Sequence, residues 1–443
     1  MSATEQPAAA SPGQTGLSKG YVNYALGMLL VIYTLNFLDR QIVNILAEPI
    51  KQDLGLSDTQ LGLLTGLAFA VVYTVFGIPI ARFADRPHAN RVWIIAIALS
   101  VWSAFTALCG LAQNFLQLTL ARIGVGIGEA GCTPPAHALI ADKVAPERRA
   151  SALALYSMGV PIGSLLGLAI GGVIADSLGW RWGFILVGLP GLLLAVVAVA
   201  TLKEPRRLAA MKAVQAAAPP QASIFKALGE LGRKKAYWNV CFAAAVISFL
   251  GYGQIAFFGS FFVRVHQMPI SEIGLLLGLM IGVSGVIGTF IGGQIADAAA
   301  KKDTRAYVTV PAVAIIAGGP FFVAAMLTPN PYLCIALLAV PTGLNSLWYG
   351  PVYAAVQGIV PPRLRATAVA IMLFIVNMIG LGLGPLTLGL VSDYFATALG
   401  MGAAEGLRWA ILTTGAVGLI AFTFFLLARR TIREELEAAK SET

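Results

Sequence analysis

The sequence has few charged residues, because Asp, Glu, Lys and Arg together make up only 12% of its 443 residues. About a quarter of the residues of a soluble globular domain are charged. Hydrophobic residues make up 58% of this chain, and its mean hydropathy is +0.80. This composition excludes a soluble globular domain and indicates a polytopic membrane protein.

Histidine and cysteine are also scarce, with three and four copies. The histidines lie at positions 88, 137 and 266, and the cysteines at 109, 132, 241 and 334. Neither set has the spacing of a metal site or a disulfide framework. The chain also lacks a Ser/His/Asp set and a nucleotide-binding loop. We therefore expect no enzyme activity, no cofactor, no metal and no ATP-driven pump.

Long apolar runs recur between Tyr21 and Leu427. Each is long enough to cross about 30 Å of hydrocarbon as a helix. A helix satisfies its own peptide groups in lipid, whereas a barrel would show short alternating segments. We predict an all-α polytopic membrane protein of twelve spans: 22–48, 58–83, 91–113, 115–141, 148–175, 181–202, 237–264, 271–296, 304–328, 332–360, 364–394 and 405–428.

The basic residues determine the expected topology. Nearly all of them lie in connections on one side of the predicted spans, namely Lys19, 82–91, 143–149, 203–235, 301–305, 363–365 and the tail. The other side holds Lys51, Arg181, Arg264 and Arg408. By the positive-inside rule both termini are cytoplasmic, and the net charge of +9 reflects this distribution rather than nucleic-acid binding.

The order of spans and polar segments predicts five regions. They are a disordered cytoplasmic N-terminus at 1–20, a six-helix bundle at 21–202, a cytoplasmic linker at 203–236, a second six-helix bundle at 237–428 and a charged cytoplasmic tail at 429–443. We expect a monomer surrounded by membrane lipids.

The two predicted bundles repeat each other. A shift of 216 residues places Pro135 on Pro351 and Arg149 on Arg365. A shift of 212 places Gly62, Gly66 and Asp85 on Gly274, Gly278 and Asp297, and a G-x-x-x-D pattern recurs at Gly172–Asp176 and Gly389–Asp393. Parallel halves of this kind are typical of transporters that bind cargo at the interface near the midplane.

Glycines mark two predicted helix contacts. Gly124, Gly126, Gly128 and Gly131 lie in the fourth span, and Gly163, Gly167 and Gly171 recur every four residues in the fifth. Small residues let neighbouring helices approach closely. Pro161, two residues before the second set, is expected to bend its helix.

Four charged residues lie well inside the spans, and all belong to the first half: Asp39, Arg40, Arg122 and Glu129. Such residues are costly in a membrane and are functional candidates. The shift of 216 takes Arg122 to Leu338 and Glu129 to Asn345, so symmetric packing does not require these charges. The alternatives are a structural ion pair and, for Arg40, a position near the outer interface.

Helix geometry indicates how these charges are presented. Arg122 and Glu129 share a face about 10 Å apart along the axis, whereas Asp39 and Arg40 point about 100° apart and need not pair. We hypothesise that Asp39 and Glu129 carry a coupled proton, because no other acid lies deep in a span. Arg122 would bind an anionic head group with paired donors and change the proton affinity of these acids.

The other expected substrate contacts are polar or aromatic residues near the middle of the spans. They are Asn36 and Arg40 in the first half, and Tyr252, Gln254, Phe257, Phe258, Asn345, Trp348, Tyr349 and Asn377 in the second. The alternative for each aromatic residue is packing against lipid or at the interface.

The segment A-R-F-A-D-R-P-H-A-N-R at 81–91 contains the candidate gating residues Asp85, Arg86 and Arg91. We expect Asp85 to cap a helix that starts near Pro362. An arginine would meet Asp142 or Glu147, which together would favour an outward-open state. The alternative is that these residues determine topology only.

With these motifs, the chain from about Tyr21 to Arg430 resembles the major facilitator superfamily, and within it the spinster-type lipid transporters. The segment at 81–91 resembles the superfamily's loop 2–3 motif, with Ala81 where Gly is usual. R-I-G-V-G-I-G-E-A-G resembles its fourth-span motif, and G-V-P-I-G loosely resembles its exporter motif. L-N-F-L-D-R, G-E-A-G and P-E-R-R-A resemble the spinster type in particular.

The resemblance implies proton coupling and head-group recognition at Asp39, Arg122 and Glu129, and a gating role for Asp85, Arg86 and Arg91. It also implies a lysolipid or a sphingosine 1-phosphate-like cargo, carried by alternating access. The alternatives are proton-coupled transport of a small organic anion and a sensor derived from a transporter. We expect a location in a bacterial inner membrane.

Overall fold

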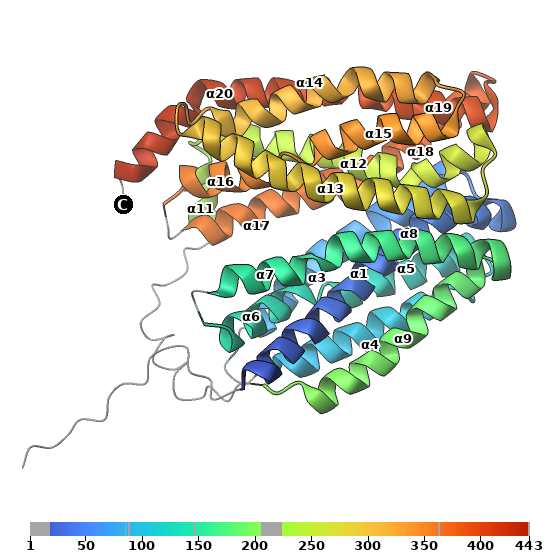
Figure 1. Ribbon diagram of the computed structural model, residues 1–443, viewed down its shortest axis with the longest axis horizontal. Coiled ribbons are helices and arrows are strands. Elements are labelled where there is room, and N and C mark those ends of the chain that lie inside the picture. Colours follow the sequence, from blue (N-terminus) through green and yellow to red (C-terminus); the bar gives the residue numbers. More distant parts are fainter. Residues whose placement is uncertain are drawn as a thin grey trace, which may run out of the picture.

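The computed structural model describes residues 18–84, 86, 89–145, 148–204, 224–361 and 364–441. All regular secondary structure within these ranges is helical. The helices form two bundles that lie side by side, one from each half of the chain (Figure 1). The predicted all-α, two-bundle fold is confirmed.

The first half contains the helices before residue 202. They are α1 (Lys19–Leu54), α2 (Asp58–Gly62), the π-helix η1 (Leu63–Leu67), α3 (Ala68–Ala84), α4 (Arg91–Cys109), α5 (Phe115–Glu129), α6 (Thr133–Lys143), α7 (Arg149–Ser157), α8 (Gly159–Leu178) and α9 (Trp180–Thr201). The break between α7 and α8 falls at Met158, one turn before Pro161, whose ring has no N–H to continue the helix.

The second half contains α11 (Ile224–Leu231), α12 (Lys235–His266), α13 (Ile270–Ala300), α14 (Ala306–Leu327), α15 (Pro331–Asn345), α16 (Tyr349–Ile359), α17 (Arg365–Ile375), η4 (Val376–Leu383), α18 (Gly384–Asp393), η5 (Tyr394–Ala398), α19 (Gly402–Gly415) and α20 (Gly418–Ser441). The short α11 lies in the predicted linker, of which 205–223 fall outside the described residues, as do 1–17. The last helix continues through most of the predicted tail.

Eleven helices in the described ranges are long and apolar enough to cross a membrane. The remaining predicted span, 115–141, consists of two shorter helices. The first, α5, ends at Glu129, and α6 begins at Thr133 with two prolines in its first turn. This break places Glu129 at a helix end in the middle of the bundle.

The predicted glycine contacts are confirmed. A Cβ on Gly124 would lie 2.3 Å from the Phe105 ring of α4, and one on Gly128 would lie 2.5 Å from the Trp102 nitrogen. A Cβ on Gly163 would lie 2.3 Å from the Thr34 carbonyl oxygen of α1. The glycines therefore allow α5 to approach α4, and α8 to approach α1, more closely than larger residues would.

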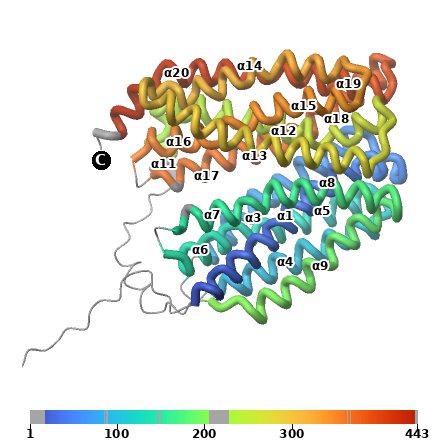
Figure 2. Tube along the Cα trace, in the orientation of Figure 1, coloured from blue at the N-terminus to red at the C-terminus, as the bar shows by residue number. Residues whose placement is uncertain are grey.

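The two halves meet at the end of the molecule opposite the start of α1 and the end of α20. We call the two ends the terminal end and the opposite end; in Figure 2 the C-terminus marks the terminal end, at the left. The main contacts between the halves are those of α8 with α13 and of α2 with α18. Among the described residues, no contact of comparable extent joins α6 or α7 to α16 or α17 at the terminal end.

The hydrophobic core has the same asymmetry between the two ends. One buried cluster runs through the first half and continues across the interface into Phe257, Phe261 and Ile273 of the second half. A separate cluster, which includes Tyr237, Val356 and Phe425, fills the terminal end of the second half. The halves therefore share a core only at the opposite end.

The sequence repeat corresponds to a repeated contact between the halves. A Cβ on Gly62 of α2 would lie 2.3 Å from the carbonyl oxygen of Pro385 in α18. A Cβ on Gly274 of α13 would lie 2.2 Å from the carbonyl oxygen of Leu168 in α8. Gly62 and Gly274 are repeat-related by 212 residues, and Leu168 and Pro385 by 217. The two interfaces therefore use the same packing twice, about a pseudo-twofold axis.

Candidate transport site

A cavity lies between the halves near the middle of the bundle. It encloses about 480 Å³, including the space at its mouth. The first half contributes Phe37, Arg40, Gln41, Asn44, Thr65, Phe69 and Arg122, and the second contributes Tyr252, Ile255, Ala256, Leu381 and Pro385. Its charged side chains thus come from the first half, and the lining from the second half is uncharged.

Asp39 of α1 pairs with Arg122 of α5. The Arg122 Nη1 atom lies 3.5 Å from the Asp39 Oδ1 atom, and the Thr106 hydroxyl of α4 donates a hydrogen bond to the same carboxylate. All three residues are buried. Charges that are removed from water in this way need a partner of opposite charge, and here Asp39 and Arg122 are each other's partner.

Arg40 of α1 pairs with Glu129 at the end of α5. The Arg40 Nε atom donates a 2.5 Å hydrogen bond to the Glu129 Oε2 atom. The Arg40 guanidinium also lies 4.5 Å from the centre of the Tyr73 ring and 5.0 Å from that of Phe69. The Arg40 side chain is 17% exposed, whereas that of Arg122 is 2% exposed. Arg40 is therefore the more accessible cation in the cavity.

The four charges form two crossed pairs between the same two helices. Adjacent residues of α1 reach opposite partners on α5, as expected from their roughly 100° separation, so the expectation that Asp39 and Arg40 need not pair is confirmed. Phe69 lies within reach of both guanidinium groups.

Several buried polar atoms of the crossed pairs and of the nearby Asn36 have no hydrogen-bond partner. They are both amide atoms of Asn36, Asp39 Oδ1, Arg122 Nε and Nη1, and Glu129 Oε1. Unsatisfied buried groups are costly and usually have a reason. These atoms offer hydrogen-bonding capacity to a proton or a polar head group.

The expected contacts in the second half separate into three groups. Tyr252 lines the cavity. Tyr349 is 41% exposed and stacks on the buried Trp348 at 4.2 Å, and Asn345 and Asn377 are half-buried. Phe257 and Phe258 are buried in the shared core, and Gln254 lines a separate small cavity within the second half. In this conformation only Tyr252, among the residues expected from the second half, lines the central cavity.

At the terminal end, Arg91 and Asp142 are in contact. Arg91 Nη1 donates a 2.6 Å hydrogen bond to Asp142 Oδ2, and Glu204 accepts from the Arg91 backbone nitrogen at 3.0 Å. Burial raises the pKa of Glu204. Arg86 is exposed and lies over the Phe83 ring. Asp85, Glu147 and Pro362 lie outside the described residues, so the gating role stays a prediction.

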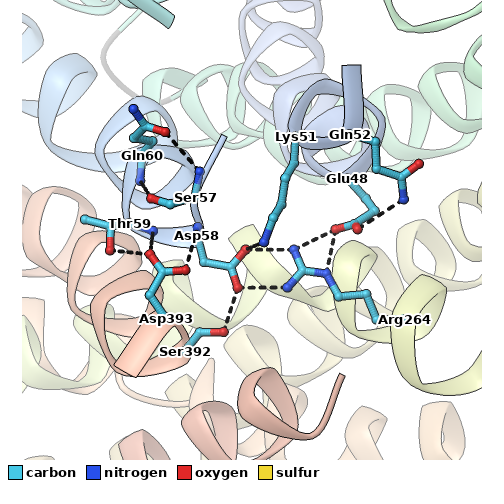
Figure 3. Close-up of polar contacts among 10 residues, drawn as sticks. All are labelled: Glu48, Lys51, Gln52, Ser57, Asp58, Thr59, Gln60, Arg264, Ser392 and Asp393. Carbon is cyan, nitrogen blue, oxygen red and sulfur yellow. Dashed lines mark hydrogen bonds and ion pairs between the residues drawn. The ribbon is translucent and has the colours of Figure 1, made fainter. Parts of the chain in front are cut away.

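A polar cluster at the opposite end was not predicted from the sequence (Figure 3). Arg264 of α12 donates to Glu48 of α1 at 2.8 Å and to both carboxylate oxygens of Asp58 in α2 at 2.7 and 2.8 Å. Lys51 donates to Asp58 at 2.6 Å, as does Ser392 of α18. The internal repeat could have identified this cluster, because the shift of 216 places Glu48 on Arg264, an acid on a base.

A cavity between two pseudo-symmetric helical bundles defines a membrane transporter, and the comparisons identify its family. The profile of the Major Facilitator Superfamily matches residues 29–385. The chain belongs to this superfamily and is related to its spinster-type members. It is a multi-pass integral membrane protein and a transporter of small molecules, not an enzyme.

Two curated relatives and one solved structure support this assignment. An "MFS-type efflux pump" of Mycolicibacterium smegmatis is 36% identical over 94% of this chain and 95% of its own length. A "Hexuronate transporter" of Bacillus subtilis is 26% identical over 84% of this chain and 88% of its own. A crystal structure described as a bacterial homologue of the human lysosomal transporter spinster, inward-facing and unoccupied, superposes with a TM-score of 0.84. It is 35% identical and covers 95% of this chain and 99% of that one.

Proposed function

We propose that this protein is a proton-coupled secondary transporter that moves an amphiphilic anion, a lysolipid or a sphingosine 1-phosphate-like molecule, by alternating access. The observation that carries the proposal is the pair of crossed ion pairs at a cavity shared by the two halves. Two acids and two arginines in one place let a cargo anion compete with a carboxylate for an arginine, and let a proton compete with an arginine for a carboxylate.

Coupling follows from this competition. A buried carboxylate binds a proton more readily when its arginine partner leaves, and less readily when the arginine returns. An anionic head group that attracts Arg122 or Arg40 therefore leaves Asp39 or Glu129 to take a proton. When the cargo departs, the arginine pairs again and the proton is released.

The lining of the cavity favours an amphiphile. Arg40 presents a guanidinium to the cavity, and planar guanidinium groups bind phosphate or carboxylate with paired donors. Phe37, Phe69, Ile255 and Leu381 provide apolar surface in the same cavity. A head group would bind at the first half, and its tail would lie along the second.

We also propose that both termini are cytoplasmic and that the membrane is a bacterial inner membrane. The basic residues support this orientation by the positive-inside rule. The structure would then be inward-facing, because the halves share a core only at the opposite end. Likeness to an inward-facing bacterial structure supports this interpretation.

The test is uptake into sealed proteoliposomes under an imposed pH gradient. We expect labelled lysolipid to accumulate against its gradient and accumulation to stop when a protonophore is added. If accumulation continues unchanged after the protonophore is added, proton coupling is rejected. Absence of both accumulation and counterflow, with binding intact, would indicate a sensor instead.

A small organic anion is the second candidate, because a relative of 26% identity is named a hexuronate transporter. A thermal-shift screen with lysolipids and short carboxylates separates the two candidates, since a ligand that binds the native state raises the apparent melting temperature. Stabilisation by short carboxylates alone would reject the amphiphile.

A further inference from the structure

Asp176 near the end of α8 and Asp393 at the end of α18 are repeat-related, and each binds the other half of the molecule. Asp176 of α8 accepts a 2.8 Å hydrogen bond from the Ser271 nitrogen at the start of α13. Asp393 of α18 accepts a 2.7 Å hydrogen bond from the Thr59 nitrogen at the start of α2. Asp176 and Asp393 end the two G-x-x-x-D patterns, and Thr59 and Ser271 are related by the shift of 212. The contact is therefore made twice, once on each side of the pseudo-twofold axis.

A third contact lies at the axis itself. The helices α1 and α12 both start at a lysine, 216 residues apart, and the same shift takes Glu48 to Arg264. These repeat-related positions touch, with Arg264 nitrogens 2.7 and 2.8 Å from Glu48 Oε2. Only residues near a twofold axis can meet their own symmetry mates. Two like charges would repel each other there, whereas Glu48 and Arg264 attract.

One of the two outer contacts is stronger than the other. Besides the Thr59 nitrogen, Asp393 accepts from the Asp58 nitrogen at 3.0 Å and the Thr59 hydroxyl at 2.6 Å. Asp58 in turn binds Arg264, whereas its repeat-related position holds Ile270. Asp58 therefore connects the contact between α2 and α18 to the Glu48–Arg264 pair (Figure 3).

The central members of this set are shielded from water. Glu48 is 5% exposed and Asp58 is 1% exposed, and the Arg264 side chain is 7% exposed. Breaking a buried pair is costly, because it leaves a charge without a partner. The contacts of Asp176, Asp393 and Arg264 described above all join one half to the other. Separation of the halves at the opposite end must therefore break all of them.

We propose that Asp176, Asp393 and the Glu48–Arg264 pair are gating residues that close the cavity at the opposite end. We call these four residues the twofold latch. The proposal rests on alternating access as the proposed function. The latch holds the halves together while the terminal end is open, and its release admits or discharges cargo at the opposite end.

The test measures the opening of the opposite end by distances between spin labels on Leu111 and Leu399. Both residues are exposed, and they lie at this end in different halves. The four native cysteines are buried, so the introduced cysteines are labelled selectively. The variants are Arg264→Gln, Asp393→Asn and Asp176→Asn. The control is Asp53→Asn, because Asp53 lies at the same end but pairs with Arg181 of its own half.

We expect the long-distance population to rise about tenfold or more in Arg264→Gln and Asp393→Asn, because each loses charge-assisted hydrogen bonds to the other half. Asp176→Asn, which loses fewer, should show a smaller rise, and the control should match the parent protein. Parent-like distances in Asp393→Asn and Asp176→Asn would overturn the latch. Asparagine keeps the shape of aspartate, so these two variants decide the question if Arg264→Gln does not fold.

The distance measurement needs neither cargo nor a proton gradient, so it separates the latch from the proposed function. Failure of the parent protein to transport would reject the function and leave the distance result standing. Unchanged distances in a protein that still transports would reject the latch alone.

Discussion

The two halves of this transporter share a backbone plan but differ in chemistry at equivalent positions. On α1 the first half places Asn36, Asp39 and Arg40, where α12 of the second half has Tyr252, Ile255 and Ala256. On α5 it places Arg122 and Glu129, where the second half has Leu338 and Asn345. The buried charges at the centre are thus confined to one half, and the other half offers aromatic and apolar surface.

At the opposite end the two halves form contacts at equivalent positions instead, although the side formed by α2 and α18 has more of them. The paired glycines, the two capping carboxylates and the axial ion pair all occupy repeat-related positions. Under the proposed function, symmetry is kept where the halves would rock against each other and is broken where cargo and proton would bind. Each prediction below perturbs one side of this comparison.

The largest effect is expected from removing the charges of both acids of the first half. Glu129→Gln with Asp39→Asn should abolish accumulation driven by a pH gradient, a loss of about 100-fold or more, because neither amide can carry the proton. Glu129→Gln alone should still bind cargo but fail to concentrate it. Uptake by sealed proteoliposomes under a pH gradient measures this loss.

Glu272→Gln is the matched control for the acids. Glu272 lies on α13 and accepts from the exposed Tyr332 hydroxyl, away from the cavity. Its variant should accumulate cargo normally. If the double variant of the central acids also accumulates cargo from the pH gradient alone, the proton follows another path and both acids are structural.

Arg122→Lys should weaken cargo binding by roughly thirtyfold, although the charge is kept. A lysine cannot give the paired donors of a guanidinium, and charge-assisted hydrogen bonds contribute about 2 kcal/mol. Titration of purified protein with labelled cargo measures the affinity. Normal affinity with lost pH dependence would show that Arg122 serves coupling and does not hold the head group.

Arg40→Ala gives the first half the residue that the second half has at the related position, Ala256. We expect about a tenfold loss of cargo affinity, because the exposed guanidinium and its ring contacts disappear. The control is Arg181→Ala, whose partner Asp53 lies at the surface of the same half. Equal affinities in these two variants would contradict a head-group role for Arg40.

Much of this arrangement follows from the sequence alone. Apolar runs predict the helices, and the repeat predicts two equivalent halves. Asp39, Arg122 and Glu129 are identified because buried charges are rare and costly in membranes. The crossed pairing could not be predicted, because helix phase gives only the direction of a side chain and not which helix it meets.

The polar cluster at the opposite end was not predicted from the sequence. Arg264, Lys51 and Asp58 lie near predicted span ends, where charges are ordinarily solvated, so nothing in their local sequence indicates burial. Phe257 and Phe258 were expected in the cavity, but both pack in the core that the two halves share at the opposite end. Both outcomes depend on how closely the two halves approach, which is a tertiary property.

The last effect is expected from the repeat-related glycines Gly62 and Gly274. An alanine Cβ at either position would lie 2.3 or 2.2 Å from a backbone carbonyl oxygen of the other half, so the interface must open. Overpacking typically costs about 1 to 3 kcal/mol, or at least roughly fivefold in a two-state ratio.

Because the two contacts are equivalent, Gly62→Ala and Gly274→Ala should shift the label distances at the opposite end in the same direction and by similar amounts. The controls are Gly77→Ala in α3 and Gly293→Ala in α13, since a Cβ at either would meet nothing within 4 Å. Alanine also favours helix over glycine, so these controls should be as stable as the parent protein or slightly more so. A shift in only one of the two test variants would show that the halves are equivalent in sequence and geometry but not in energy. The side formed by α2 and α18, with Asp58 and Arg264, would then dominate closure.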